Sequence, residues 1–236
     1  MPIDNNVQLP IGIATHRNMV AGFDGIHKFG YNSAVGTSFE TVWDGGNGYT
    51  YPSTATTATA TSSNTSSDNG GTVEIQGLDE NYDLATETVT IGGSASTTTF
   101  IRVFRALLKT ANTGDSNVGT ITITVDSTTV AQIQPTYGQT LMAIYTVPRN
   151  HTAYILQLDI GSSKDLENEV ALLTKEIDNG NVWNTKSYVT TRGGFMEKNY
   201  VIPVKLPEKT DIELRAKASA TSAISGGFEI ILQKHL

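Results

Sequence analysis

The histidines and their nearby carboxylates are the first residues whose types suit catalysis. His16, Asp24 and His27 lie close together in the sequence and would form a small acid–base site if the fold made them converge. His151 and His235 are isolated, and no two of the histidines stand at metal-ligand spacing on one strand. The chain also lacks the metalloprotease, serine-hydrolase and phosphate-loop motifs. This pattern favours structural or surface histidines, and we predict no enzymatic activity.

Two groups of carboxylates have the residue types of a glycosidase acid–base pair or of a calcium site with oxygen ligands. They are Asp79, Glu80 and Asp83 in one group, and Asp159, Glu167 and Glu169 in the other. Carboxylates gathered in loops more often form a solvated rim, so we predict no metal and no cofactor. The absence of Cys excludes thiol catalysis, cysteine-ligated zinc and disulfides.

A third candidate is an aromatic cluster beside a glycine-rich turn. Trp43, Tyr49 and Tyr51 flank residues 44–48, and three exposed rings of this kind would form a binding platform for a sugar. The alternative is that the rings close the end of a β-sandwich, which is the more common role of aromatics next to a turn. Of all the candidates, these three residues are the ones that we assign to a binding site.

Strands must position these residues, because the clearest pattern in the chain is a strand pattern. Ile121, Ile123 and Val125 alternate with threonines, which indicates a half-buried antiparallel strand. Turn residues then separate three more apolar segments, so residues 118–161 predict a meander of four short strands. Its aliphatic face needs a second sheet to cover it, which predicts a β-sandwich or barrel.

Similar segments run through the rest of the chain without any alternation of strands and helices. We predict an all-β fold, an antiparallel β-sandwich of about a dozen short strands with jelly-roll-like topology. The predicted single domain covers residues 21–236 and follows an irregular N-terminal arm over residues 1–20. Two small sandwiches divided near Gly114 are the alternative.

Local signals add detail to this fold. Residues 161–169 are the one place where a helix is plausible, although the alternation that follows favours a strand. Asn179 and Gly180 predict a hairpin turn, the pair Gly193 and Gly194 predicts a break, and Pro203 predicts an edge strand.

Two further segments carry predictions about exposure. Residues 53–69 contain only Ser, Thr, Ala, Asn and Asp, and we predict a strand as far as Thr61 and a solvated loop over residues 62–71. Arg102 and Arg105 fall on opposite faces of the strand predicted over residues 97–108. Arginine on both faces predicts an edge strand or a face that meets a partner.

Charge and hydropathy limit the classes of partner. The formal net charge is −7, and Lys and Arg are scattered singly, which argues against a nucleic-acid partner. No apolar run approaches the ~18 residues of a membrane helix, and the first residues do not resemble a secretory signal. We therefore expect a soluble protein that folds in a reducing cytoplasm, without a membrane partner.

Several blocks of sequence resemble one family of proteins. They include residues 28–32 (KFGYN), 39–46 (FETVWDGG), 100–106 (FIRVFRA), 178–183 (DNGNVW), 210–215 (TDIELR) and 223–230 (AISGGFEI). These blocks are similar to structural proteins encoded by marine tailed bacteriophages, including cyanophages, and the resemblance extends from about Gly22 onward. It implies a virion component without enzymatic activity, made in the host cytoplasm, and it assigns no functional residues.

Three functions fit this expectation. The first is a capsid decoration or cement protein, a homotrimer or other homo-oligomer that binds the major capsid protein and stabilises the head. The second is a tail or head-to-tail component, such as an adaptor, a collar or a fibre-anchoring protein. The third is a host-receptor or carbohydrate-binding module, for which Trp43, Tyr49 and Tyr51 would be the binding platform.

Overall fold

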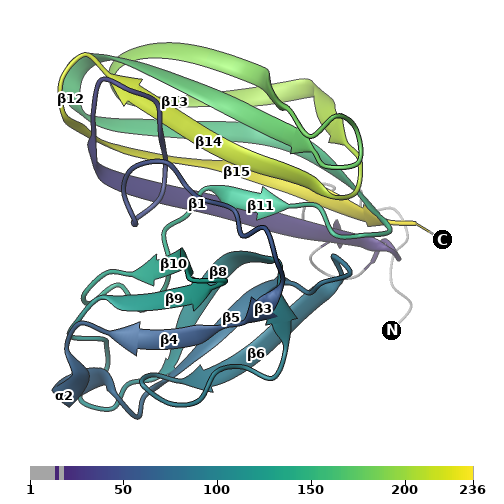
Figure 1. Cartoon of the computed structure of the whole chain (residues 1–236). Coiled ribbons are helices and arrows are strands. Elements are labelled where there is room, and N and C mark those ends of the chain that lie inside the picture. The colour runs from purple at the N-terminus through teal and green to yellow at the C-terminus, as the bar shows by residue number, and fades with distance from the viewer. Residues whose placement is uncertain (1–13, 16–18, 236) are drawn as a thin grey trace, which may run out of the picture.

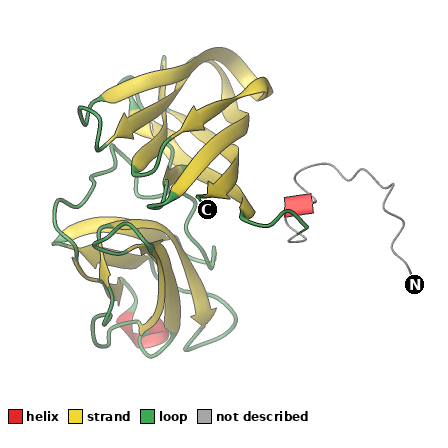
Figure 2. Ribbon diagram, turned by 90° about the vertical axis from the view of Figure 1, so that its right-hand side faces the viewer, coloured by secondary structure: helices red, strands yellow, loops and turns green. Residues whose placement is uncertain are grey.

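The computed structural model describes residues 14–15 and 19–235 and is built almost entirely of antiparallel strands. Figure 1 shows that the strands gather into two lobes, and Figure 2 shows the same division from the side. The prediction of an all-β antiparallel sandwich is confirmed. Most of the predicted N-terminal arm lies outside the described residues, so the arm stays a prediction.

The larger lobe is one antiparallel sheet of seven strands. Its order is β1-β15-β12-β14-β11, with β13 paired to β12 and β2 paired to β14. The strands are β1 (Phe23–Val35), β2 (Glu40–Thr41), β11 (Ile144–Thr146), β12 (His151–Glu176), β13 (Trp183–Leu206), β14 (Thr210–Ala218) and β15 (Ser222–Lys234). The first and last of these strands are neighbours, so the sheet joins the two ends of the described chain.

The long hairpin of β12 and β13 curls this sheet into a nearly closed barrel. The first half of β12 pairs with β15 and its second half pairs with β14, so the hairpin passes around a corner between them. At this corner Gly193 and Gly194 have φ of 66° and 68°, which residues with a Cβ rarely adopt. The prediction that these glycines break the strand is wrong, because they bend β13 without ending it. A helix over residues 161–169 is also absent, since β12 runs through this segment.

The smaller lobe is formed by the segment between β2 and β11. Three small antiparallel sheets, β10-β9-β4, β6-β5-β8 and β3-β7, surround a second core. Its elements are β3 (Thr56–Thr57), β4 (Thr59–Ser62), α2 (Thr65–Asp68), β5 (Thr72–Leu78), β6 (Leu84–Thr90), β7 (Thr99–Phe100), β8 (Arg102–Thr110), β9 (Ile121–Val125) and β10 (Thr128–Ile133). The chain thus leaves the larger lobe, builds the smaller one and returns.

Each of the two hydrophobic cores includes side chains that come from the other lobe. Ile101 and Phe104 come from the smaller lobe but pack in the core of the larger one. Ile144 of β11 belongs to the larger lobe by chain position and packs in the core of the smaller one. A division near Gly114 does not occur, because β8 and β9 on either side of it lie in the same lobe. The single domain over residues 21–236 stays a prediction.

The predicted four-strand meander is divided between the lobes. Strands form within residues 118–161 where they were predicted, and Ile121, Ile123 and Val125 are buried. However, only β9 and β10 pair with each other as a hairpin. β11 pairs with β14, and β12 pairs with β13, β14 and β15, so these two strands belong to the larger lobe. The alternation identified the strands but carried no information about their partners.

The polar segment after β4 is not the solvated loop that was predicted. Asn64 caps the short helix α2, since its side-chain oxygen accepts a hydrogen bond from Ser67 N at 3.2 Å. Asp68 at the end of α2 is 3% exposed, and its carboxylate accepts hydrogen bonds from the backbone N atoms of Val118 and Gly119, both at 2.8 Å. The segment therefore anchors the strand that begins at Ile121.

One prediction about a turn and one about an edge strand are confirmed. Residues 178–181 form the turn between β12 and β13, with φ of 78° at Gly180 and 52° at Asn181. Among the described strands, β13 hydrogen-bonds only with β12, so Pro203 lies on an edge strand as expected.

Candidate functional site

The predicted aromatic site is closed rather than open. Trp43 is 5% exposed and Tyr49 is 6% exposed, and their rings meet edge to face with centroids 5.1 Å apart. Tyr49 and Tyr51 meet in the same way at 4.8 Å, and Tyr51 lies next to Trp183 of β13. Because Trp43 and Tyr49 are buried and Tyr51 is half-buried, these rings do not form an open surface on which a sugar could stack. The structure thus does not present these residues as the predicted platform, and they fill the junction between the lobes instead.

A buried group of charges lies beside these rings. Arg102 of β8 contacts Asp211 of β14 through two hydrogen bonds, Nε to Oδ1 at 2.8 Å and Nη2 to Oδ2 at 3.1 Å. Lys175 of β12 approaches the second oxygen of Asp211 at 3.2 Å, and Thr146 donates to the first at 2.7 Å. The Asp211 side chain is fully buried, so these partners replace the water that it loses. Arg102 is therefore internal, although β8 is an edge strand of its sheet, as the arginines on both of its faces predicted.

A second buried carboxylate extends the same group toward the aromatic rings. Glu213, also fully buried, accepts two hydrogen bonds from the Arg215 guanidinium at 2.8 and 3.1 Å, and a third from Thr41. The hydroxyl of Tyr51 donates to Glu213 at 3.3 Å. Burial, followed by the nearby Glu213 charge, raises the pKa of Tyr51 well above its ordinary value. The buried carboxylates of Asp211 and Glu213 thus both have hydrogen-bond and ion-pair partners within the protein, which is typical of a structural role.

The described histidine and carboxylate candidates do not converge on a common site. His16 lies outside the described residues, and His27 pairs with Glu229 at 2.7 Å on the neighbouring strand. Asp83 pairs with Arg149 at 2.5 Å. In the second carboxylate group, Glu169 pairs with Lys217 at 2.9 Å. Within residues 14–15 and 19–235, no three His, Asp or Glu side chains are placed to hold a metal ion.

The surface that differs most from an ordinary protein exterior lies on β13. Ile155 of β12 pairs with Val204 of β13, and Gln157 of β12 pairs with Asn199 of β13. The single residue between Ile155 and Gln157 therefore lies opposite the longer segment 200–203 of β13. This excess length forms a bulge on the edge strand, with Val201 fully exposed and Ile202 84% exposed. We call these two side chains the Val201/Ile202 knuckle.

The knuckle was missed at the level of sequence, where the segment around Pro203 was predicted only as an edge strand. Its one local signal was Pro203, which indicated an edge but not a bulge. Phe195, on the same strand, is also 70% exposed. Adjacent aliphatic side chains held in water on an unpaired edge are typical of a surface that binds a partner.

None of the described helices is long and apolar enough to span a membrane. No protein-family model matches the chain, and no curated protein matches it. A chain in a solved structure of infectious bursal disease virus, Gx strain, aligns with 90% of this chain and 71% of its own length. The aligned residues are 10% identical and the TM-score is 0.24, which supports no conclusion about fold or function.

Proposed function

We propose that this chain is a non-enzymatic structural protein of a tailed-bacteriophage virion, and that it decorates the capsid by binding the major capsid protein. The sequence blocks that resemble phage structural proteins support the virion assignment. The observation that carries the attachment is the Val201/Ile202 knuckle on the unpaired edge of β13.

The knuckle has the chemistry of an anchor. Burying an aliphatic side chain of this size contributes about 1.5–3 kcal/mol, and both side chains are now in water. The outer edge of β13 also has backbone donors and acceptors that pair with no other described strand. An extended segment of a shell subunit would satisfy these groups by adding a strand, with the two aliphatic side chains beside it.

The size of the knuckle argues for a shell subunit rather than for a second copy in an isolated dimer. A stable dimer buries about 800 Å² per partner, far more than two side chains provide. On a capsid lattice, small contacts act together, because every copy of an oligomer has one and the bound oligomer holds the others close to their sites. The homotrimer expected of a decoration protein would present three knuckles in this way.

Stoichiometry tests the proposed location. We expect quantitative mass spectrometry of purified virions to find this chain at equality with the major capsid protein, or at a simple fraction of it. A handful of copies per particle would contradict decoration and favour a tail or collar component. Complete absence from the particle would overturn the virion assignment.

A double variant tests the anchor. Val201→Ser together with Ile202→Ser should reduce binding to shells that lack the protein at least tenfold, with an unchanged melting temperature, because both side chains are exposed. Val118→Ser is the matched control, since Val118 is 49% exposed on the smaller lobe, and binding should stay at the wild-type level. Full binding by the double variant would overturn the knuckle as the anchor while leaving the stoichiometry test intact.

A further inference from the structure

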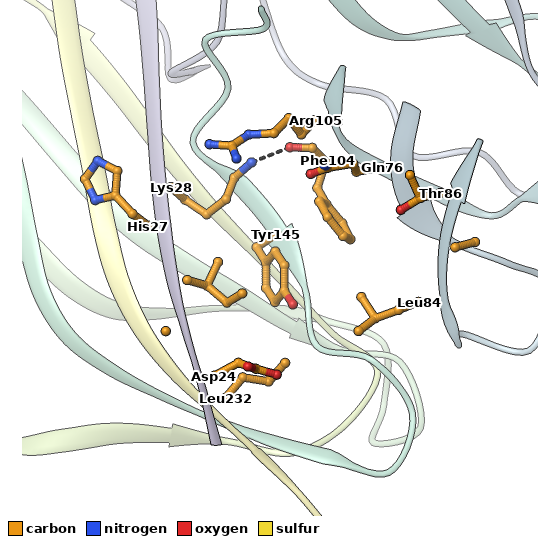
Figure 3. Close-up of a pocket in the computed structure, with 13 residues that line it drawn as sticks. Asp24, His27, Lys28, Gln76, Leu84, Thr86, Phe104, Arg105, Tyr145 and Leu232 are labelled. Atoms are coloured by element: carbon orange, nitrogen blue, oxygen red, sulfur yellow. Dashed lines mark hydrogen bonds between the residues drawn. The ribbon is translucent and has the colours of Figure 1, made fainter. Parts of the chain in front are cut away.

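A cavity between the lobes contains two cations without a carboxylate partner. It lies between β1 of the larger lobe and β5, β6 and β8 of the smaller lobe and has a volume of about 470 Å³. Lys28 and Arg105 stand close together at one end of it, as Figure 3 shows. Most other cations of the described chain pair with Asp or Glu, which makes these two unusual in a protein of net charge −7.

Lys28 is a buried amine with little compensation. It is 4% exposed, and among the described atoms its one hydrogen bond from Nζ is to the backbone oxygen of Phe104. Burial, followed by the Arg105 charge, lowers the pKa of Lys28 to about 7, while Asp44 acts in the opposite direction. A buried ammonium is costly without a nearby anion, so the arrival of a carboxylate would be favourable here.

Besides the polar residues Asp24, His27, Gln76 and Thr86, the rest of the cavity has an apolar wall and one orphan hydroxyl. Phe104, Tyr145, Leu84 and Leu232 line it, and Leu232 and Tyr145 are each 1% exposed. The Tyr145 hydroxyl is buried and has no hydrogen-bond partner in the described part of the chain. A buried donor of this kind costs about 1–3 kcal/mol until an acceptor reaches it. Figure 3 shows the ring of Tyr145 between Lys28 and Leu84, beside the apolar wall.

We infer that this cavity binds an amphipathic monocarboxylate, whose carboxylate pairs with Lys28 and Arg105 and whose apolar body packs against Phe104, Tyr145 and Leu84. Charge complementarity selects the head group, because two cations face the cavity at one end. The apolar wall selects the body, and an oxygen on that body would accept the Tyr145 hydroxyl. This inference is independent of the proposed function, since it uses no residue of β13.

Calorimetric titration of the full chain with octanoate tests the site, with 1-octanol as the neutral ligand of equal chain length. Octanoate should bind at least tenfold more tightly than octanol. Lys28→Met should remove this preference, whereas Lys234→Met, which deletes an exposed lysine, should retain it. Equal binding of the two ligands, or the absence of octanoate binding at millimolar concentration, would overturn the inference.

A second variant covers the outcome in which Lys28→Met fails to fold. Arg105 is only half-buried, and no ion pair or side-chain hydrogen bond ties it to the described structure, so Arg105→Gln should fold normally and weaken octanoate at least fivefold. Nuclear Overhauser contacts between the octanoate chain and the rings of Phe104 and Tyr145 provide a readout of position. Contacts to other aromatic rings alone would contradict the assignment.

Discussion

The guanidinium of Arg102 lies at the junction between the lobes and donates two hydrogen bonds to the carboxylate of Asp211, at 2.8 and 3.1 Å. The side chains of both residues are nearly inaccessible to water, with exposed fractions of 7% and 0%. Arg102 also contacts the Tyr51 ring at 5.0 Å, so the pair is embedded among aromatic groups. The two lobes are thus joined by a charged contact as well as by their shared cores.

Loss of one member of this pair should destabilise the protein severely. Arg102→Met leaves the Asp211 carboxylate buried with only Lys175 as a charged partner, and removal of one member of a buried pair typically costs about 3–5 kcal/mol. The free energy of unfolding, measured by chemical denaturation, should fall by this amount. Arg192→Met is the control, because Arg192 and Asp165 form an exposed pair and its loss should cost less than about 1 kcal/mol.

The short helix α2 should matter far more than its polar composition indicates. Asp68→Ala removes the acceptor for Val118 N, Gly119 N and the Ser62 hydroxyl, and we expect a loss of at least about 2 kcal/mol. Asp115→Ala, which deletes an exposed carboxylate of the same lobe, should leave the melting temperature nearly unchanged. If the two variants melt together, the segment is a solvated loop after all.

Stability should rise with pH above neutrality because of Lys28. Its ordinary pKa of 10.5 falls to about 7 in the folded chain, so between these values the unfolded chain binds a proton that the folded chain does not. The free energy of unfolding therefore increases as the pH rises from about 7 toward 10. Chemical denaturation at pH 7, 8 and 9 should show this increase in the wild type and much less of it in Lys28→Met.

The other groups near Lys28 limit the range of this test. Arg105, Asp24, His27 and Tyr145 line the same cavity, and Asp44 acts on Lys28 from outside it. Burial raises the pKa of Asp44 to about 7, so below about pH 7 the folded chain binds a proton that the unfolded chain does not. In that range Asp44 makes the free energy of unfolding decrease as the pH rises, which is opposite to the effect of Lys28. A pH dependence above 7 that persists in Lys28→Met would show that another group is responsible.

Gly30 should not tolerate a side chain. A Cβ at this position would lie 2.1 Å from Val42 O and 2.4 Å from Ala143 N, and both of these are backbone atoms that cannot rotate away. Gly30→Ala should therefore lower the free energy of unfolding by at least about 2 kcal/mol. Gly48→Ala is the matched control, because no atom lies within 4 Å of its Cβ position. Equal stability of the two variants would contradict the close packing of β1 against these backbones.

Sequence patterns predicted the features that depend on neighbouring residues. The alternation at Ile121, Ile123 and Val125 identified β9, and Asn179 with Gly180 identified the hairpin turn. Pairings between distant segments were not predictable in the same way. β1 pairs with β15, and nothing in the types of residues on either strand specifies the other as its partner.

The candidate sites show the same limit. The aromatic residues were identified from their types, but the Tyr51 ring is contacted by Arg102 and its hydroxyl by Glu213, which come from distant strands. The knuckle depends on the register of β13 against β12, and register is set by pairing rather than by composition. Residue types therefore indicated the kinds of contact, while the pairing of strands decided where they occur.

The strands of the smaller lobe leave the ribosome before β11 to β15 of the larger lobe, so the smaller lobe can fold first. Strands β3 to β10 lie within residues 56–133 and pair with one another, so this lobe can close while the rest is still being made. β1 must wait for β15, because Phe23 pairs with Gln233 and Asn32 pairs with Ile224. Contacts between such distant residues slow folding. Until β15 has been made, β1 therefore lacks this strand partner, and an unpaired strand has backbone groups with which another chain can pair.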